Sequence, residues 1–98
     1  MIRNVVLIRL PDDADQRARD ELAAGLAGIA ALDLPGQLEV RVGLDAGLRG
    51  GGWSAAITND WLDAAAYRAY DLDPEHQVHR ARIVAVAADV ARVQLEVD

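Results

Sequence analysis

The opening segment constrains the fold of this chain more than any other. Residues 2–10 form an apolar run rich in β-branched side chains, and Pro11 ends it, which is typical of a β-strand. Both faces of this strand carry apolar side chains, with Asn4 as the polar exception on one of them. Both faces are therefore expected to be covered, one of them by helices.

The remaining elements follow from the spacing of apolar residues. A stripe at helical spacing predicts a helix that begins after Asp12 or Asp13 as its cap and ends before the Leu34-Pro35-Gly36 turn. Asp60 is expected to cap a second helix, which Pro74 interrupts and which then resumes. The predicted helices cover residues 13–32, 61–72 and about 74–88, and the later strands cover residues 37–44, 53–59 and 90–97. This β-α-β-β-α-β order predicts a single ferredoxin-like α+β domain over residues 1–98.

The sheet face opposite the helices is not expected to be plain solvent surface. Strands 37–44 and 90–97 each have an apolar face and a face of mixed charges, and the helices are expected to cover the apolar faces. The opposite side would then carry Val5, Leu7, Glu39, Arg41, Arg92 and Glu96. A sheet from a second copy packed there would close a homodimeric barrel, which would also supplement a small, alanine-rich core. A solvated monomer face is the alternative.

Composition excludes several classes of function. A net charge of −6 argues against a nucleic-acid partner, and the absence of Lys excludes lysine Schiff-base chemistry. The absence of Cys excludes disulfides, thiol catalysis and thiolate metal sites. No signal peptide and no apolar stretch near 18 residues is present, so we expect a cytoplasmic protein with no membrane partner.

The candidate catalytic groups lie around the interruption at Pro74. Tyr70 and His76 flank it, and a phenol and an imidazole are side chains that can transfer protons near neutral pH. His76 would act as a general base beside a carbonyl group and Tyr70 as the proton donor. The alternative is that both pack in the core, each with a hydrogen-bond partner.

Three further residues are candidates for substrate binding. Asn4 lies on the strand face expected to meet the helices, where a buried amide needs a partner such as a ligand carbonyl or a backbone group. Asp73 is a turn residue before Pro74 that could orient His76, and Trp61 is a candidate for the pocket wall. A metal site formed by Asp73, His76 and His79 is weakly indicated, and we expect neither a metal nor a cofactor.

Two segments resemble the stress-responsive A/B barrel (Dabb) family. The opening Met-Ile-Arg-Asn-Val-Val-Leu-Ile-Arg-Leu is similar to the first strand of that family. The segment Trp61–Tyr70, followed by Asp73-Pro74-Glu75-His76-Gln77, resembles its aromatic-led helix and His-Pro-x-His turn. The resemblance covers the whole chain in length and element order, and it implies a ferredoxin-like fold whose two subunits close a barrel.

The resemblance also implies a chemistry. Olivetolic acid cyclase, a distant member of the family, cyclises a linear polyketide thioester without a cofactor, and its catalytic Tyr and His correspond to Tyr70 and His76. This chain departs from the family at Asn4, where members carry a His, and at Asp73, the first His of His-Pro-x-His. Asn4 cannot titrate but can still hydrogen-bond a carbonyl.

Three functions are consistent with the sequence. The first is a cofactor-independent cyclase or aldol-type lyase acting on a small, largely apolar, polyketide-like carbonyl compound. The second is a non-catalytic, stress-associated module that binds a small molecule in the same pocket. The third is a cofactor-independent monooxygenase-like protein. Whether the chain is an enzyme stays open at the level of sequence.

Overall fold

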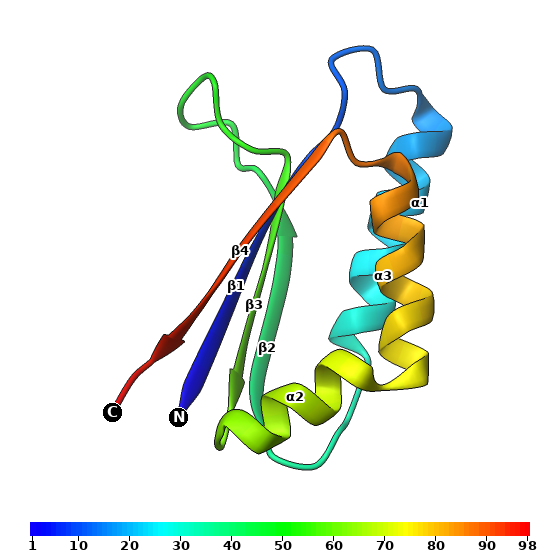
Figure 1. The fold of residues 1–98 in the computed structure, drawn as a ribbon. Coiled ribbons are helices and arrows are strands. Elements are labelled where there is room, and N and C mark those ends of the chain that lie inside the picture. Colours follow the sequence, from blue (N-terminus) through cyan, green and yellow to red (C-terminus); the bar gives the residue numbers. More distant parts are fainter.

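A computed structural model describes residues 1–98 and confirms the ferredoxin-like α+β fold (Figure 1). Three helices lie on one side of a four-stranded sheet. The elements in chain order are β1 (Ile2–Arg9), α1 (Gln16–Ala30), β2 (Gln37–Leu44), β3 (Ala55–Trp61), α2 (Ala64–Leu72), α3 (Pro74–Val86) and β4 (Asp89–Glu96). None of the helices is both long and apolar enough to cross a membrane.

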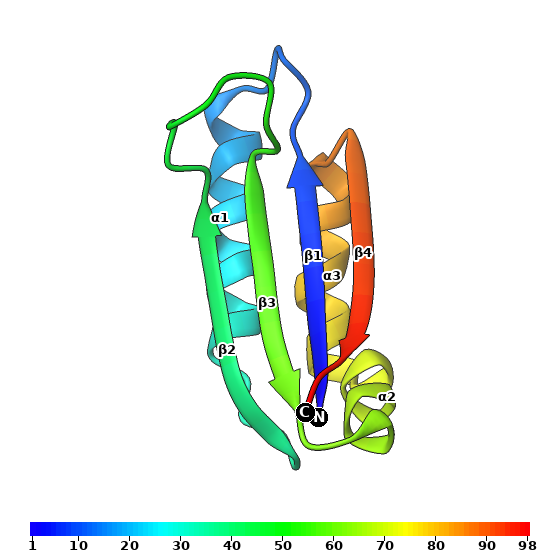
Figure 2. The ribbon, with the colours of Figure 1, turned by 90° about the vertical axis from the view of Figure 1, so that its left-hand side faces the viewer.

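The strands lie in the order β2-β3-β1-β4, and every neighbouring pair is antiparallel (Figure 2). β1 is thus a central strand, with β3 on one side and β4 on the other. Figure 2 views the sheet from the side without helices, and no element of the chain covers that side.

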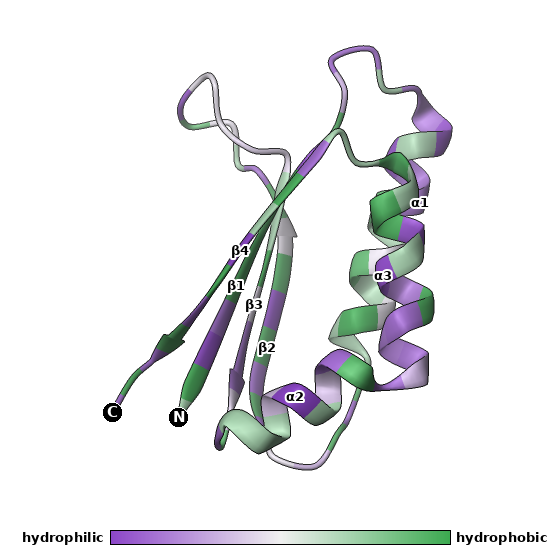
Figure 3. Ribbon diagram, in the orientation of Figure 1, coloured by the Kyte–Doolittle hydropathy of each residue, from purple (hydrophilic) through white to green (hydrophobic).

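The main core lies between the sheet and the helices α1 and α3. Hydrophobic and hydrophilic residues alternate along the strands, as Figure 3 shows, so each strand offers one set of side chains to the helices. A smaller cluster of Leu32, Trp61 and Tyr70 fills the end of the molecule next to α2. The main cluster comprises Ile8, Leu10, Leu22, Leu26, Ile29, Ala55, Ile57 and Ile83.

Helix α1 begins later than predicted. Its cap is Asp15, whose carboxylate accepts a hydrogen bond of 2.9 Å from the backbone N–H of Ala18. Asp12 and Asp13 instead form a turn after Pro11, so the prediction that one of them caps the helix was wrong. Several acidic residues in a row each match the preference for a cap, and only the path of the chain selects among them.

Strand β3 continues further than predicted, and Trp61 is its last residue rather than the first of a helix. The β1–β3 pairing runs on to Ile2 opposite Trp61 and places Arg3 opposite Asp60. The Arg3 guanidinium donates two hydrogen bonds, of 2.8 and 3.0 Å, to the Asp60 carboxylate. Asp60 is therefore an ion-pair partner, and Asp63 caps α2 through a 2.8 Å bond from the Ala66 N–H.

The two faces of β4 are the reverse of those predicted. Arg92 pairs with Val6 and Glu96 with Ile2, so both face the helices. Val93 and Leu95 lie on the open face, where Val5 stands directly opposite Val93. β4 is an edge strand, so its charged side chains reach solvent at the margin of the helix layer. The open face is consequently more apolar over β1 and β4 than the sequence pattern indicated.

Two glycines of α1 permit a close approach of α3. A Cβ atom on Gly25 would lie 2.5 Å from Cγ1 of Ile83 and 3.1 Å from the backbone oxygen of His79. A Cβ atom on Gly28 would overlap the imidazole of His79.

Replacement of Gly25 by Ala should therefore destabilise the protein. Overpacking costs about 1–3 kcal/mol, and the better helix propensity of Ala offsets about 1 kcal/mol of this. We expect the free energy of unfolding to fall by up to about 2 kcal/mol in urea denaturation. Gly50→Ala is the matched control, because a Cβ there meets nothing within 4 Å. Equal stability of Gly25→Ala and wild type would show that the two helices are free to separate.

Candidate functional site

The junction of α2 and α3 positions the candidate catalytic groups. Asp73 ends α2 and caps α3, with its carboxylate accepting a 3.0 Å hydrogen bond from the backbone N–H of His76. Pro74 takes the first position of α3, where its missing N–H costs nothing. This capped turn fixes the backbone of His76 in the first turn of α3.

The structure brings Tyr70 and His76 together. The ring centroids of Tyr70 and His76 are 4.0 Å apart, and the ring planes are inclined by 32°. The Tyr70 ring also stacks on Trp61, with a centroid distance of 4.6 Å. Tyr70 is 4% exposed and His76 is 5% exposed. The two rings are in contact through their faces, and no hydrogen bond joins the two side chains.

A cavity lies beside these rings, between the sheet and the helices. Its volume is about 50 Å³. Side chains from β1, β3, β4 and all three helices line it, and nine of the fourteen are hydrophobic. They are Asn4, Val6, Ile8, Ile29, Ile57, Tyr67, Tyr70, Asp71, His76, Arg80, Ile83, Val84, Val90 and Arg92.

Asn4 supplies a buried amide to this cavity. It is 2% exposed, and its Oδ1 accepts a 3.0 Å hydrogen bond from Nε2 of Gln94 on the neighbouring strand. This bond fixes the orientation of the amide, and Nδ2 makes no hydrogen bond within the chain. The amide nitrogen of Asn4 is therefore the group available to a ligand acceptor.

A second buried amide, that of Asn59, was not predicted from the sequence. It lies directly across from Asn4 in the β1–β3 pairing and is 2% exposed. Its Oδ1 accepts a 3.0 Å hydrogen bond from Nε1 of Trp61, while its Nδ2 is buried without a partner. Asn59 stands between Thr58 and Asp60, so no isolated polar residue in an apolar run marks it as it marks Asn4.

Burial sets the protonation states of the two rings. It lowers the pKa of His76 below the usual 6.5, although the carbonyl groups of Asp71 and Tyr70 and the charge of Asp71 act in the opposite direction. No carbonyl forms a well-aligned hydrogen bond with Nδ1 of His76, which is buried and unpartnered. Burial also raises the pKa of Tyr70, and Asn59 opposes that rise. His76 and Tyr70 are therefore both neutral at pH 7.

The other residues singled out in the sequence lie outside the cavity. Trp61 stacks on the Tyr70 ring, and the Asp73 carboxylate accepts a hydrogen bond from the backbone N–H of His76. His79 packs over Gly28 of α1, away from His76. The trio of Asp73, His76 and His79 thus does not converge as metal ligands do, and no other group of His, Asp and Glu side chains does so.

Four side chains of the lining were not predicted. Tyr67 lies one turn before Tyr70 on α2, Asp71 directly follows Tyr70, and Arg80 lies one turn beyond His76 on α3. Arg92 enters from β4, the strand whose faces were predicted the wrong way round. Helical spacing from Tyr70 and His76 would have identified Tyr67 and Arg80.

Comparison with known proteins agrees with this architecture. The family model of the Stress responsive A/B Barrel Domain (Dabb) matches residues 2–97. The chain belongs to the Dabb family. No curated protein matches the sequence.

Solved structures share the fold over nearly the full chain. A dimeric ferredoxin-like protein of unknown function from Thermobifida fusca is 28% identical, with a TM-score of 0.84 over 98% of this chain and 90% of that one. A hydroxynitrile lyase from Passiflora edulis is 16% identical, with a TM-score of 0.77 over 99% and 93% of the chains. SnoaB, a cofactor-independent oxygenase from Streptomyces nogalater, is 17% identical, with a TM-score of 0.70 over 98% and 91%. At such identities the last two show the shared Dabb-like fold alone.

The depressed pKa of His76 predicts a pH dependence of stability. Between the pKa in the folded state and the ordinary 6.5 of the unfolded state, the unfolded chain binds the additional proton. The contribution of neutral His76 to stability is therefore complete above pH 6.5 and falls as the pH drops below it. We expect the His76 imidazole resonances, assigned by their loss in His76→Gln, to titrate below pH 6.5 in NMR spectra. A midpoint above 6.5 would contradict the burial of a neutral ring.

Proposed function

We propose that this Dabb protein is a cofactor-independent cyclase or aldol-type enzyme acting on a small, polyketide-like carbonyl compound. The observation that supports this most is the contact of a buried, neutral His76 with Tyr70 at the wall of a mostly apolar cavity. Asn4 adds an amide nitrogen with no partner in the chain. These three groups supply a base and two hydrogen-bond donors within one enclosed space.

The three groups have distinct roles in the proposed reaction. His76 removes a proton from the carbon beside a carbonyl group, and the Tyr70 hydroxyl and the Asn4 amide donate hydrogen bonds to the enolate oxygen that forms. The enolate carbon then attacks a second carbonyl of the same molecule and forms the new carbon–carbon bond. The imidazolium of His76 returns its proton to the resulting alkoxide, so the step needs no other reactant. The low polarity of the cavity strengthens both hydrogen bonds.

The cavity limits the size of the reacting part. A space of about 50 Å³ admits a compact apolar group rather than a long chain. Val84 of α3 is 51% exposed and Arg92 of β4 is exposed as well, so the cavity opens between these two elements. The remainder of a longer substrate would leave through this mouth.

Two relatives with the same fold support catalysis by such a scaffold. The Passiflora edulis protein is a hydroxynitrile lyase, and SnoaB is an oxygenase that needs no cofactor. We carry over from them only that this architecture accommodates enzymes. The roles of Tyr70, His76 and Asn4 rest on the cavity described above.

Turnover by site variants tests the proposed roles. Removal of a proton next to a carbonyl is followed as deuterium incorporation from D₂O into small ketones by proton NMR. We expect His76→Gln to lower the rate about 10²- to 10⁴-fold and Tyr70→Phe to lower it by about 10- to 100-fold. His79→Gln, which removes the imidazole outside the cavity, should retain the wild-type rate. Equal rates in all four proteins would refute the assignment.

We further propose that the protein is a homodimer joined through the open face of its sheet. Val5 and Leu7 of β1 and Val93 and Leu95 of β4 form an apolar area there, and Val93 and Leu95 are 49% and 43% exposed. The Arg3–Asp60 pair lies beside this area on the same face. The Thermobifida fusca relative is described as dimeric, which supports this assembly.

Replacing one apolar residue of this face should weaken the dimer. Leu95→Asp places a charge in the proposed interface, and we expect the dimer dissociation constant to rise about 100-fold in analytical ultracentrifugation. Leu48→Asp is the matched control, because Leu48 is 88% exposed in the β2–β3 loop. A wild-type protein that sediments as a monomer at micromolar concentration would exclude the proposed assembly.

A further inference from the structure

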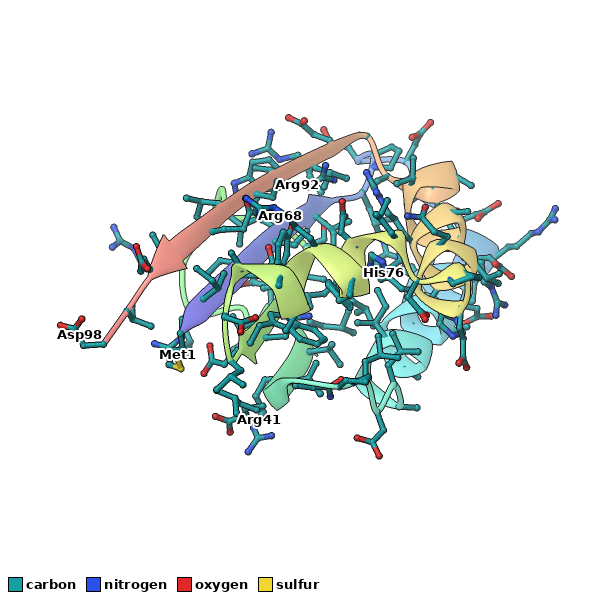
Figure 4. All side chains as sticks on the ribbon, turned by 60° about the horizontal axis from the view of Figure 1, so that its bottom comes forward. Met1, Arg41, Arg68, His76, Arg92 and Asp98 are labelled. Carbon is teal, nitrogen blue, oxygen red and sulfur yellow. The ribbon has the colours of Figure 1, made fainter.

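Two arginines stand on opposite sides of the cavity mouth. Arg80 lies on α3, one helical turn beyond His76, and Arg92 lies on the helix-facing side of β4. Both line the same cavity as His76. Figure 4 shows His76 at the start of α3 and Arg92 on β4, on either side of the space between helices and sheet. Two arginine side chains thus line the mouth of a cavity whose interior is mostly apolar.

Neither arginine is tightly paired within the chain. The guanidinium of Arg80 lies 3.7 Å from the Asp71 carboxylate, at the outer limit of an ion pair, and the two side chains are 37% and 46% exposed. Arg92 forms no ion pair and donates no hydrogen bond within the chain. Because His76 is neutral, the Asp71 carboxylate offsets the charge of only one of the two arginines. One positive charge therefore remains at the mouth of a protein whose net charge is −6.

Tyr67 gives independent evidence that the charges converge. Burial raises the pKa of its phenol, Asp71 raises it further, and Arg92 and Arg80 both act in the opposite direction. Charges from α2, α3 and β4 thus act on one side chain of the cavity wall. All four side chains line the same cavity.

The distance from these side chains to the catalytic groups is short. His76 and Arg80 are four residues apart on α3, so their Cβ atoms are about 5–6 Å apart along the same face. A ligand that reaches both is compact, with its two polar ends separated by a few carbon atoms. The hydrophobic lining between them suits an aliphatic connection.

We propose that the substrate is a small oxo acid whose carboxylate is held between Arg80 and Arg92, an inference that rests on the proposed function of the same cavity. Its carbonyl group lies beside Tyr70, His76 and Asn4, and its aliphatic body fills the apolar space. Arginine presents paired N–H donors that match the two oxygens of a carboxylate. The two arginines are thus residues that determine specificity.

The charge at the mouth distinguishes a carboxylate from other anions. One excess positive charge balances one negative charge, whereas a phosphate or phosphonate carries up to two near pH 7. The Asp71 carboxylate would repel the second charge of such a group. A monocarboxylate is therefore the anion that the site fits.

Binding of matched probes tests this inference without any need for turnover. The probe is 4-oxopentanoate, and its neutral counterpart is 4-oxopentanamide, which has nearly the same shape. Isothermal titration calorimetry with the full-length protein should show about tenfold tighter binding of the carboxylate at low salt. Raising NaCl from about 0.05 to 0.5 M should weaken binding of 4-oxopentanoate and leave that of the amide unchanged. A phosphonate analogue, 3-oxobutylphosphonate, should bind more weakly than the carboxylate.

Variants assign the effect to the two arginines. Arg92→Gln and Arg80→Gln should each remove most of the preference for the carboxylate over the amide while leaving affinity for the amide unchanged. Arg49→Gln, which changes the charge equally in the exposed β2–β3 loop, is the control and should retain the preference. Thermal melting of each variant, monitored by circular dichroism, verifies that it is folded.

The outcomes separate this inference from the proposed function. Equal binding of the carboxylate and the amide by wild type, or binding of neither probe, overturns the inference, as does a preference that survives both arginine variants. A preference that depends on the arginines supports it, even where His76→Gln and Tyr70→Phe exchange deuterium at the wild-type rate. In that case the cavity binds an oxo acid without the proposed catalysis.

Discussion

The hydrogen bond from the His76 backbone N–H to the Asp73 carboxylate is the interaction on which the rest of the site depends. Without this cap, α2 and α3 would lack a defined corner, because Pro74 only prevents one helix from running into the other. The cap sets the direction of α3 and thereby places His76 against Tyr70. It also sets which face of α3 lines the cavity, including Arg80 one turn further along.

The arrangement also involves a compromise between stability and function. The amides of Asn4 and Asn59 and the imidazole of His76 are buried in a small domain, and Nδ2 of Asn59 and Nδ1 of His76 have no partner in the chain. Each such atom costs about 1–3 kcal/mol relative to a paired one. Apolar residues of similar size at these positions would give a more stable core. Asn4 and His76 line the cavity, whereas Asn59 lies directly across from Asn4 in the β1–β3 pairing.

Much of the architecture is predictable from local pattern, while the site depends on pairing between strands. The element order and the positions of Tyr70 and His76 on either side of a helix break follow from periodicity and from Pro74. The faces of β4 do not, because alternation identifies two faces without identifying which one meets the helices. Only the pairing of Val6 with Arg92 decides it, and this placed Arg92 at the cavity. The role of Asp60 was hidden for a similar reason, since its partner Arg3 is 57 residues away.

The short connection between α3 and β4 has a consequence for how molecules enter. Only Ala87 and Ala88 join the two elements, so both margins of the mouth belong to one continuous segment of the chain. β4 is an edge strand that pairs with β1 alone. The width of the opening therefore depends on the backbone hydrogen bonds between β1 and β4, and no separate lid is required. The rate at which molecules enter and leave the cavity should then depend on how often these hydrogen bonds open. The strand that carries Arg92 therefore also controls this rate.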